Sequence, residues 1–223
     1  MSADSPKDAG ASPPSPQKKT TKLLSCAVAL TLAFASGKAH AQNLTETFIG
    51  IDPGLAVEGT FTGSVSTNEV VSGISKFATF EAFCVEPTQA ISYGETLVYQ
   101  IQDTNTLAES ATIARLVGGY LQSSRTARDA AAVQWAIWET VAETSLPDSL
   151  ADGNVRIDSA VNQDTLALAN FYLANVNSYT AASLTYLKND TRQDMVTWNV
   201  VPEPGSLALG LVSGLMLLRR KRR

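Results

Sequence analysis

The chain has 223 residues, with 17 Lys+Arg against 21 Asp+Glu, a length that suits one domain plus short targeting segments. Between residues 42 and 201 there are 7 Lys+Arg and 18 Asp+Glu, which gives this segment a net charge of −11. Such an acidic segment repels phosphate backbones, so the composition argues against nucleic-acid binding.

The first 41 residues have the pattern of a secretory signal peptide. A polar stretch and three lysines precede an apolar run of 14 residues, 23–36, and the small-x-small sequence Ala39-His40-Ala41 follows it. We therefore predict cleavage between Ala41 and Gln42. The apolar run is shorter than the roughly 20 residues that a spanning helix needs, although an uncleaved membrane anchor is the alternative.

Removal of this signal peptide restricts the chemistry that the mature chain can perform. His40 is the only histidine, so the mature chain has no imidazole, which excludes Ser-His-Asp and Cys-His catalysis and zinc sites that contain histidine. Cys26 is also removed, and Cys84 becomes the single cysteine. An intramolecular disulfide is then impossible, and an unpaired thiol in an oxidising compartment is unusual.

Residues 44–102 have the composition and alternation of β-strands. We expect a turn at Asp52-Pro53-Gly54, after a short apolar strand, and an exposed strand over residues 58–67. Aromatic residues over 77–85 predict a further strand. Residues 96–102 alternate clearly between apolar and polar side chains, which predicts a half-buried strand.

The hydrophobic period then changes to that of helices. Thr106 and Glu109 have the spacing of a capping box, which predicts a first helix that ends at the polar sequence 123–125. A second helix is expected from Thr126 or Asp129 to about Glu143.

A loop over residues 147–155 separates these helices from a third, expected from Asp164 to about Val176, and two strands are expected at 183–187 and 195–200. Early strands, then helices, then late strands predict an α+β domain. We expect a β-rich sandwich or barrel-like domain over 42–201, with about three helices inserted between the early and late strands.

The C-terminus has three parts in a fixed order. Pro202-Glu203-Pro204 precedes an apolar stretch, 205–218, and a basic tail, 219–223. This order resembles the PEP-CTERM sorting signal, in which the apolar stretch is a short transmembrane helix. The resemblance implies a Gram-negative bacterium with an exosortase-type processing enzyme, transient anchoring in the inner membrane, and delivery to the cell surface or the extracellular matrix. A plain tail anchor explains the helix and the tail but not the Pro-Glu-Pro sequence.

Two short motifs carry the main functional signal of the acidic segment. Phe83-Cys84-Val85 is an aromatic-Cys-apolar sequence, and Gln134-Trp135-Ala136-Ile137-Trp138 begins 50 residues after the cysteine. Together they resemble the bacterial thioester domain of surface adhesins, which has an aromatic-Cys-apolar motif and a later Thr-Gln-x-Ala-apolar-Trp motif. The resemblance covers about residues 75–200, and Val133 stands where that family has threonine.

The resemblance implies an internal thioester between the Cys84 sulfur and the Gln134 side-chain carbonyl carbon. Attack on that carbon by an amine or a hydroxyl would free the thiol and attach the domain covalently to its target. Formation of the bond needs proximity, and its survival needs shielding from water, for which Phe83, Trp135 and Trp138 are the candidates. No cofactor and no metal is implied.

Other interpretations of these residues stay open. Cys84 and Gln134 could be ordinary core residues of a domain that keeps the fold without the bond, or Cys84 could form an intermolecular disulfide. The acidic loop 148–158 could bind calcium, but it lacks the spacing of an EF-hand loop. A secreted hydrolase would need two of the 18 acidic residues to converge, and no spacing supports such a pair.

The sequence therefore predicts an exported surface or matrix protein that is not an enzyme. Its expected partners are signal peptidase, an exosortase-type enzyme, the inner membrane and a surface or matrix polymer that supplies the nucleophile. The alternative is a non-covalent structural protein of an exopolysaccharide matrix or biofilm.

Overall fold

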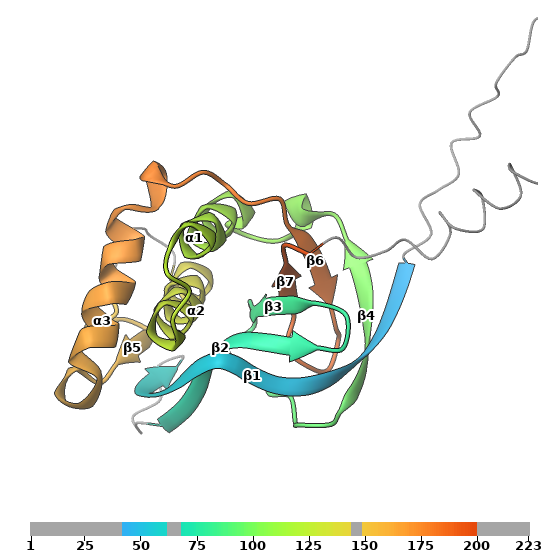
Figure 1. The fold of residues 1–223 in the computed structure, drawn as a ribbon, viewed down its shortest axis with the longest axis horizontal. Coiled ribbons are helices and arrows are strands. Elements are labelled where there is room, and N and C mark those ends of the chain that lie inside the picture. The colour runs from blue at the N-terminus through green and yellow to red at the C-terminus, as the bar shows by residue number, and fades with distance from the viewer. Residues whose placement is uncertain (1–41, 62–67, 144–148, 200–223) are drawn as a thin grey trace, which may run out of the picture. The chain divides into compact units, whose positions relative to one another are not determined.

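Seven strands and three α-helices make up the described part of the chain in the computed structural model, which covers residues 42–61, 68–143 and 149–199 (Figure 1). The strands are β1 (Gln42–Phe61), β2 (Asn68–Phe77), β3 (Glu81–Cys84), β4 (Thr96–Gln102), β5 (Val155–Ile157), β6 (Thr185–Lys188) and β7 (Met195–Thr197). The helices are α1 (Ser110–Gln122), α2 (Ala127–Ala142) and α3 (Ser159–Ala174), and two 3-10 turns are η1 (Thr104–Thr106) and η2 (Val176–Ser178).

All strand pairings are antiparallel and follow the order β2-β3-β7-β6-β4-β1-β5. Because β2 also pairs with β1, the first six of these strands form a closed ring of pairings, and β5 extends the far end of β1. The mixture of helices with one antiparallel sheet confirms the α+β prediction.

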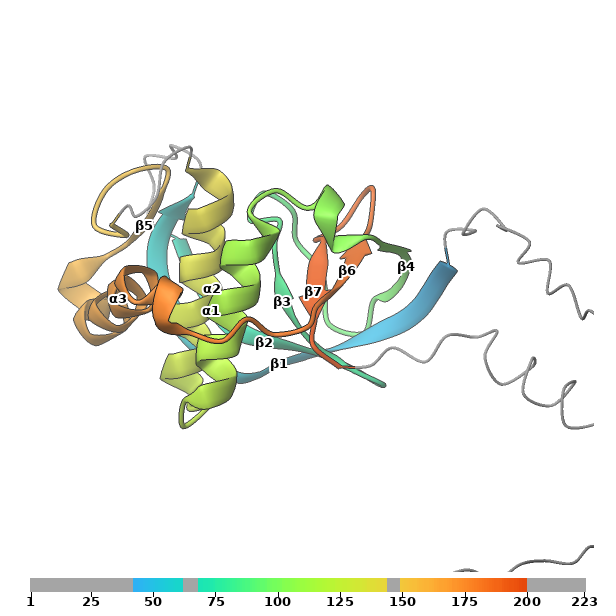
Figure 2. The same ribbon diagram turned by 90° about the horizontal axis from the view of Figure 1, so that it is seen from above.

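Helix α2 is buried on every side. All residues from Ala130 to Thr140 are buried, because α2 packs against β1, β2, β3 and β5 as well as α1 and α3. Figures 1 and 2 both show α2 between α3 and the strands. Four alanines in this stretch keep the helix slim, so its neighbours can approach closely. A capping box between Thr126 and Asp129 fixes the start of the helix. Of the two predicted starts, Thr126 is therefore the correct one.

The turn predicted at Asp52-Pro53-Gly54 is wrong. Strand β1 continues through these residues, and its register with β2 shifts between Ile51 and Gly54. An irregularity of this kind is a place where a strand tolerates proline. The later part of β1 is also less exposed than predicted. Gly59 and Thr60 are buried, and both pair with residues of β5.

The predicted start of the first helix is also wrong. Thr106 ends the 3-10 turn η1, and the Asp103 side chain caps that turn by accepting a hydrogen bond from the Asn105 N–H at 2.9 Å. Glu109 is the residue before α1 and has a left-handed backbone with φ 55°, without a side-chain cap. The helix therefore begins only at Ser110.

The third helix begins earlier than predicted. Asp158 caps α3 by accepting a hydrogen bond from the Ala160 N–H at 2.9 Å, and the helix starts at Ser159. The last residue of the expected loop, Val155, begins β5, which pairs with Gly59–Phe61 of β1.

No helix among the described residues has the length and apolar character needed to cross a membrane. The predicted signal peptide, 1–41, and the predicted sorting segment, 202–223, lie outside the described residues.

Candidate functional site

The two motif residues meet in the fold. Cys84 ends β3, Gln134 lies in the buried centre of α2, and the Gln134 side chain makes two hydrogen bonds to the Cys84 backbone. The Cys84 N–H donates to Gln134 Oε1 at 2.9 Å, and Gln134 Nε2 donates to the Cys84 carbonyl oxygen at 2.7 Å. Both residues are nearly inaccessible, at 2% and 1% exposure.

The strand register explains why a carboxamide is needed at this point. Pairing between β2 and β3 ends at Ser75 and Ala82, so no β2 residue is paired with Cys84. The next N–H, of Val85, donates to the Asp194 carbonyl oxygen on the opposite side. The polar groups of Cys84 therefore point to the side that β2 has left, where Gln134 acts as a one-residue substitute for a strand.

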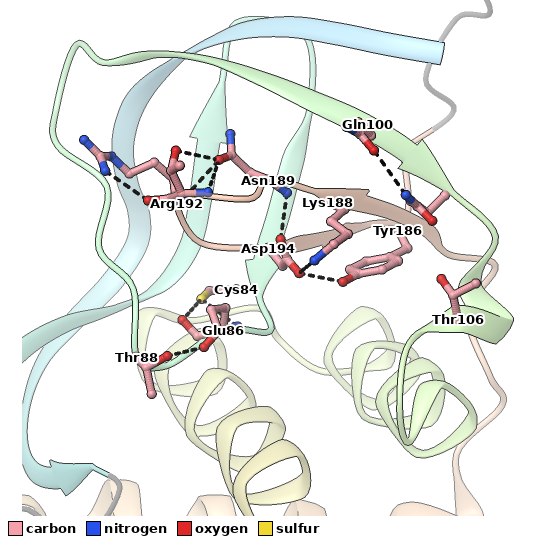
Figure 3. Close-up of polar contacts among 12 residues, drawn as sticks. Cys84, Glu86, Thr88, Gln100, Thr106, Tyr186, Lys188, Asn189, Arg192 and Asp194 are labelled. Carbon is pink, nitrogen blue, oxygen red and sulfur yellow. Dashed lines mark hydrogen bonds and ion pairs between the residues drawn. The ribbon is translucent and has the colours of Figure 1, made fainter. Parts of the chain in front are cut away.

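The Cys84 sulfur is held by the chain that follows it. The Glu86 N–H donates to the sulfur, and the thiol donates to the Glu86 carbonyl oxygen, both at 3.3 Å. Figure 3 shows the sulfur directed toward Glu86, whose carboxylate accepts a hydrogen bond from the Thr88 hydroxyl. Burial raises the pKa of the Cys84 thiol from 9.0 to about 12, while the nearby Trp138 side chain and the Glu86 backbone oppose part of that rise.

The tryptophans named as shields form one aromatic cluster with Phe61 at the end of β1. The Trp135 ring stacks on Phe61 with centroids 4.7 Å apart, and Trp138 meets both rings edge-on at 5.1 and 5.5 Å. Trp135 also donates from Nε1 to Ser72 Oγ at 3.0 Å.

Phe83, the third predicted shield, packs elsewhere. Its ring contacts Tyr120 of α1 and Trp198, with centroids 5.3 and 5.4 Å away. Neighbouring residues of a strand point to opposite faces, so this ring lies on the face opposite to the Cys84 side chain.

Two cavities flank the loop that follows Cys84. One, of about 410 Å³, is lined by Val85–Thr88 together with Val141 and Asn154. The lining of the other, of about 480 Å³, includes Phe61, Trp138 and residues 87–90. Neither lining includes Cys84 or Gln134, so both cavities lie beside the motif residues and not at them.

Asp194 supports the same strand end from the hairpin between β6 and β7. Its buried carboxylate accepts hydrogen bonds from the Tyr186 hydroxyl at 2.5 Å and from the Asn189 N–H at 2.7 Å, and Lys188 Nζ lies 3.5 Å away (Figure 3). Sequence reasoning did not predict this role, because Asp194 acts through its backbone oxygen on Val85, far from it in the chain.

The acidic loop has structural partners where the structure describes it. The Asn154 side chain donates to Glu143 Oε2 at 3.3 Å, and Asp158 caps α3. Within residues 42–61, 68–143 and 149–199, no three His, Cys, Asp or Glu side chains are grouped as a metal site requires. Asp148 lies outside these ranges.

This arrangement places the Gln134 carboxamide against the Cys84 backbone in a site that is nearly closed to solvent. The Cys84 N–H donates to the oxygen on which negative charge develops during attack at the carbonyl, as an oxyanion-hole donor does.

No protein-family model, no curated protein and no solved structure matches the chain.

Replacement of Gln134 should destabilise the fold strongly. Gln134→Ala leaves a buried N–H and a buried carbonyl of Cys84 without partners, each at a cost of about 1–3 kcal/mol. We therefore expect the free energy of unfolding to fall by about 2–5 kcal/mol, measured by urea denaturation. Gln163→Ala, which truncates an exposed glutamine of α3, is the control and should change it by less than about 0.5 kcal/mol.

The form with a free thiol should lose stability at alkaline pH. The folded chain keeps the Cys84 proton up to about pH 12, whereas the unfolded chain releases it near pH 9.0. The thiol's contribution is therefore complete below pH 9 and falls between these values, by about 1.4 kcal/mol per pH unit.

The measurement is the free energy of unfolding at pH 8 and pH 10, compared with that of Cys84→Ala, which also controls for the buried tyrosines. An equal loss in both proteins would show that residue 84 carries no titrating thiol.

Proposed function

We propose that this is an exported surface or extracellular-matrix protein whose domain attaches covalently to its target through a Cys84–Gln134 thioester. The observation that carries the proposal is the pair of hydrogen bonds, at 2.9 and 2.7 Å, between the Gln134 carboxamide and the Cys84 backbone. Residues 50 positions apart, expected from motif resemblance to react with each other, lie side by side in the core.

Formation of the bond balances without a further reactant. The Cys84 sulfur bonds to the Gln134 carbonyl carbon, the bond from that carbon to Nε2 breaks, and the thiol proton leaves with Nε2 as ammonia. Proximity in a rigid site replaces a high concentration of reactants. Burial slows hydrolysis of the product, because few water molecules reach the carbon.

Attachment then consumes the thioester. An amine or hydroxyl of a surface or matrix polymer bonds to the Gln134 carbon, and Cys84 is released as the thiol. Each molecule reacts once, so the protein is a covalent adhesin and not an enzyme. Burial of Cys84 also disfavours an intermolecular disulfide, since a second sulfur cannot approach it.

The export route is part of the proposal. The signal peptide ending at Ala41 and the Pro202-Glu203-Pro204 segment, with its apolar stretch and basic tail, support passage through the inner membrane and release at the surface by an exosortase-type enzyme.

A second candidate is a non-covalent matrix protein, and one observation favours it. The Gln134 carboxamide already has a structural role, since both its polar atoms satisfy the Cys84 backbone, and burial raises the pKa of the thiol to about 12. A thiol of that kind is a poor nucleophile unless the carbonyl is activated.

The intact mass of the purified mature domain separates the two candidates. A thioester makes the domain lighter than its sequence mass by one ammonia. Methylamine should react with the thioester to form a stable amide at Gln134 and release the Cys84 thiol. Cys84→Ala and Gln134→Ala should both have their full sequence mass. Full mass in the wild type, with one titratable thiol after unfolding, contradicts the thioester and favours the non-covalent protein.

The sorting signal is tested in a Gram-negative host that has an exosortase-type enzyme. The exported chain should begin at Gln42 and lack the basic tail, 219–223, as judged by peptide mass mapping. A Pro202→Ala/Glu203→Ala variant should keep the tail and remain in the membrane fraction. Pro13→Ala/Pro14→Ala, which removes prolines outside the motif, should behave as wild type, and equal processing of all three would refute the signal.

A further inference from the structure

The Trp138 side chain contains a buried donor without an acceptor. Trp138 is only 4% exposed, and among the described residues its Nε1 has no hydrogen-bond partner within ordinary limits of distance and angle. Trp135 differs, because its Nε1 donates to Ser72 Oγ. Buried polar groups are nearly always paired, so an unpaired one calls for a functional explanation.

Trp138 lies near the segment that holds the Cys84 sulfur. Trp138 follows Gln134 by four residues, so both side chains lie on one face of α2. It lines the same cavity as Pro87 and Thr88, in the loop directly after Cys84. The Trp138 side chain also lowers the pKa of the Cys84 thiol, as a nearby donor does.

Opening of a thioester at this site requires stabilisation of the negative charge that develops on the Cys84 sulfur. When a nucleophile attacks the Gln134 carbon, the electron pair of the carbon–sulfur bond moves to the Cys84 sulfur. Burial strongly disfavours a charged sulfur, as its pKa of about 12 indicates. The Glu86 N–H, 3.3 Å from the sulfur, is one donor that can stabilise this charge.

We propose that the Trp138 indole N–H is the second donor, and that it forms a hydrogen bond to the Cys84 sulfur as the thiolate leaves. This inference rests on the thioester function proposed above. With an amine as nucleophile, the nitrogen–carbon bond forms and the carbon–sulfur bond breaks. A proton of the amine then neutralises the sulfur to give the thiol. Trp138 and the Glu86 backbone together form the leaving-group site.

The rate of ring opening by methylamine tests this role. Trp138→Phe keeps an aromatic ring in the cluster with Phe61 but removes the N–H. It should still form the thioester, and its reaction with methylamine, followed by mass and by release of the thiol, should be at least about 10-fold slower.

Trp198→Phe is the control. It removes an indole N–H whose ring packs against Phe83 and Tyr120, on the face of β3 opposite to the Cys84 side chain. Its rate should stay within about twofold of wild type. A wild-type rate for Trp138→Phe, or equal slowing in both variants, overturns the proposal.

A spectroscopic measurement tests the contact without relying on the variant's rate. In nitrogen-15-labelled protein, Trp135→Phe and Trp138→Phe assign the corresponding indole N–H signals. Cys84→Ala should shift the Trp138 signal and leave that of Trp135 in place. An unmoved Trp138 signal overturns the contact. If the wild-type domain has its full sequence mass, the thioester itself is overturned. If the domain is one ammonia lighter and Trp138→Phe reacts with methylamine at the wild-type rate, only the role of Trp138 is overturned.

Discussion

The hydrogen-bond requirement of one strand residue organises the centre of this domain. Strand β3 extends beyond its pairing with β2, so the N–H and carbonyl of Cys84 have no strand partner on that side. A single side chain can satisfy both only if it has a donor and an acceptor, and Gln134 does so at 2.9 and 2.7 Å. Helix α2 must therefore pass directly beside β3. Its small and apolar residues, buried on all sides, make that close passage possible.

The same contact bears on whether a thioester is compatible with the fold. Loss of Nε2 as ammonia would remove the donor to the Cys84 carbonyl but would leave Oε1 as the acceptor for the Cys84 N–H. The reaction thus gives up one of two hydrogen bonds and gains a covalent link between the same elements. The proposed thioester would therefore exchange the donor to a buried carbonyl for a covalent bond between β3 and α2.

Sequence patterns predicted the parts of the fold that depend on local chemistry. The bounds of α2 followed from Thr126 and a long apolar period, and the proximity of Cys84 and Gln134 followed from motif resemblance. The misjudged parts depend on distant partners. Strand β1 continues through Asp52-Pro53-Gly54 because β2 pairs beside it, and β5 exists because β1 offers a free edge. The backbone support that Asp194 gives to Val85 leaves no signature in side-chain patterns.

Three consecutive N–H groups explain how rigidly the candidate site is held. The Cys84 N–H donates to Gln134 on α2, the Val85 N–H to Asp194 on the late hairpin, and the Glu86 N–H to the Cys84 sulfur. The first two partners come from distant parts of the chain, so movement of this segment would break contacts with a helix and a hairpin together. The Glu86 N–H thus already stabilises the sulfur in the form with a free thiol. In the thioester chemistry proposed above, the departing sulfur needs a second donor, and α2 presents the Trp138 indole one turn beyond Gln134, beside the loop that follows Cys84.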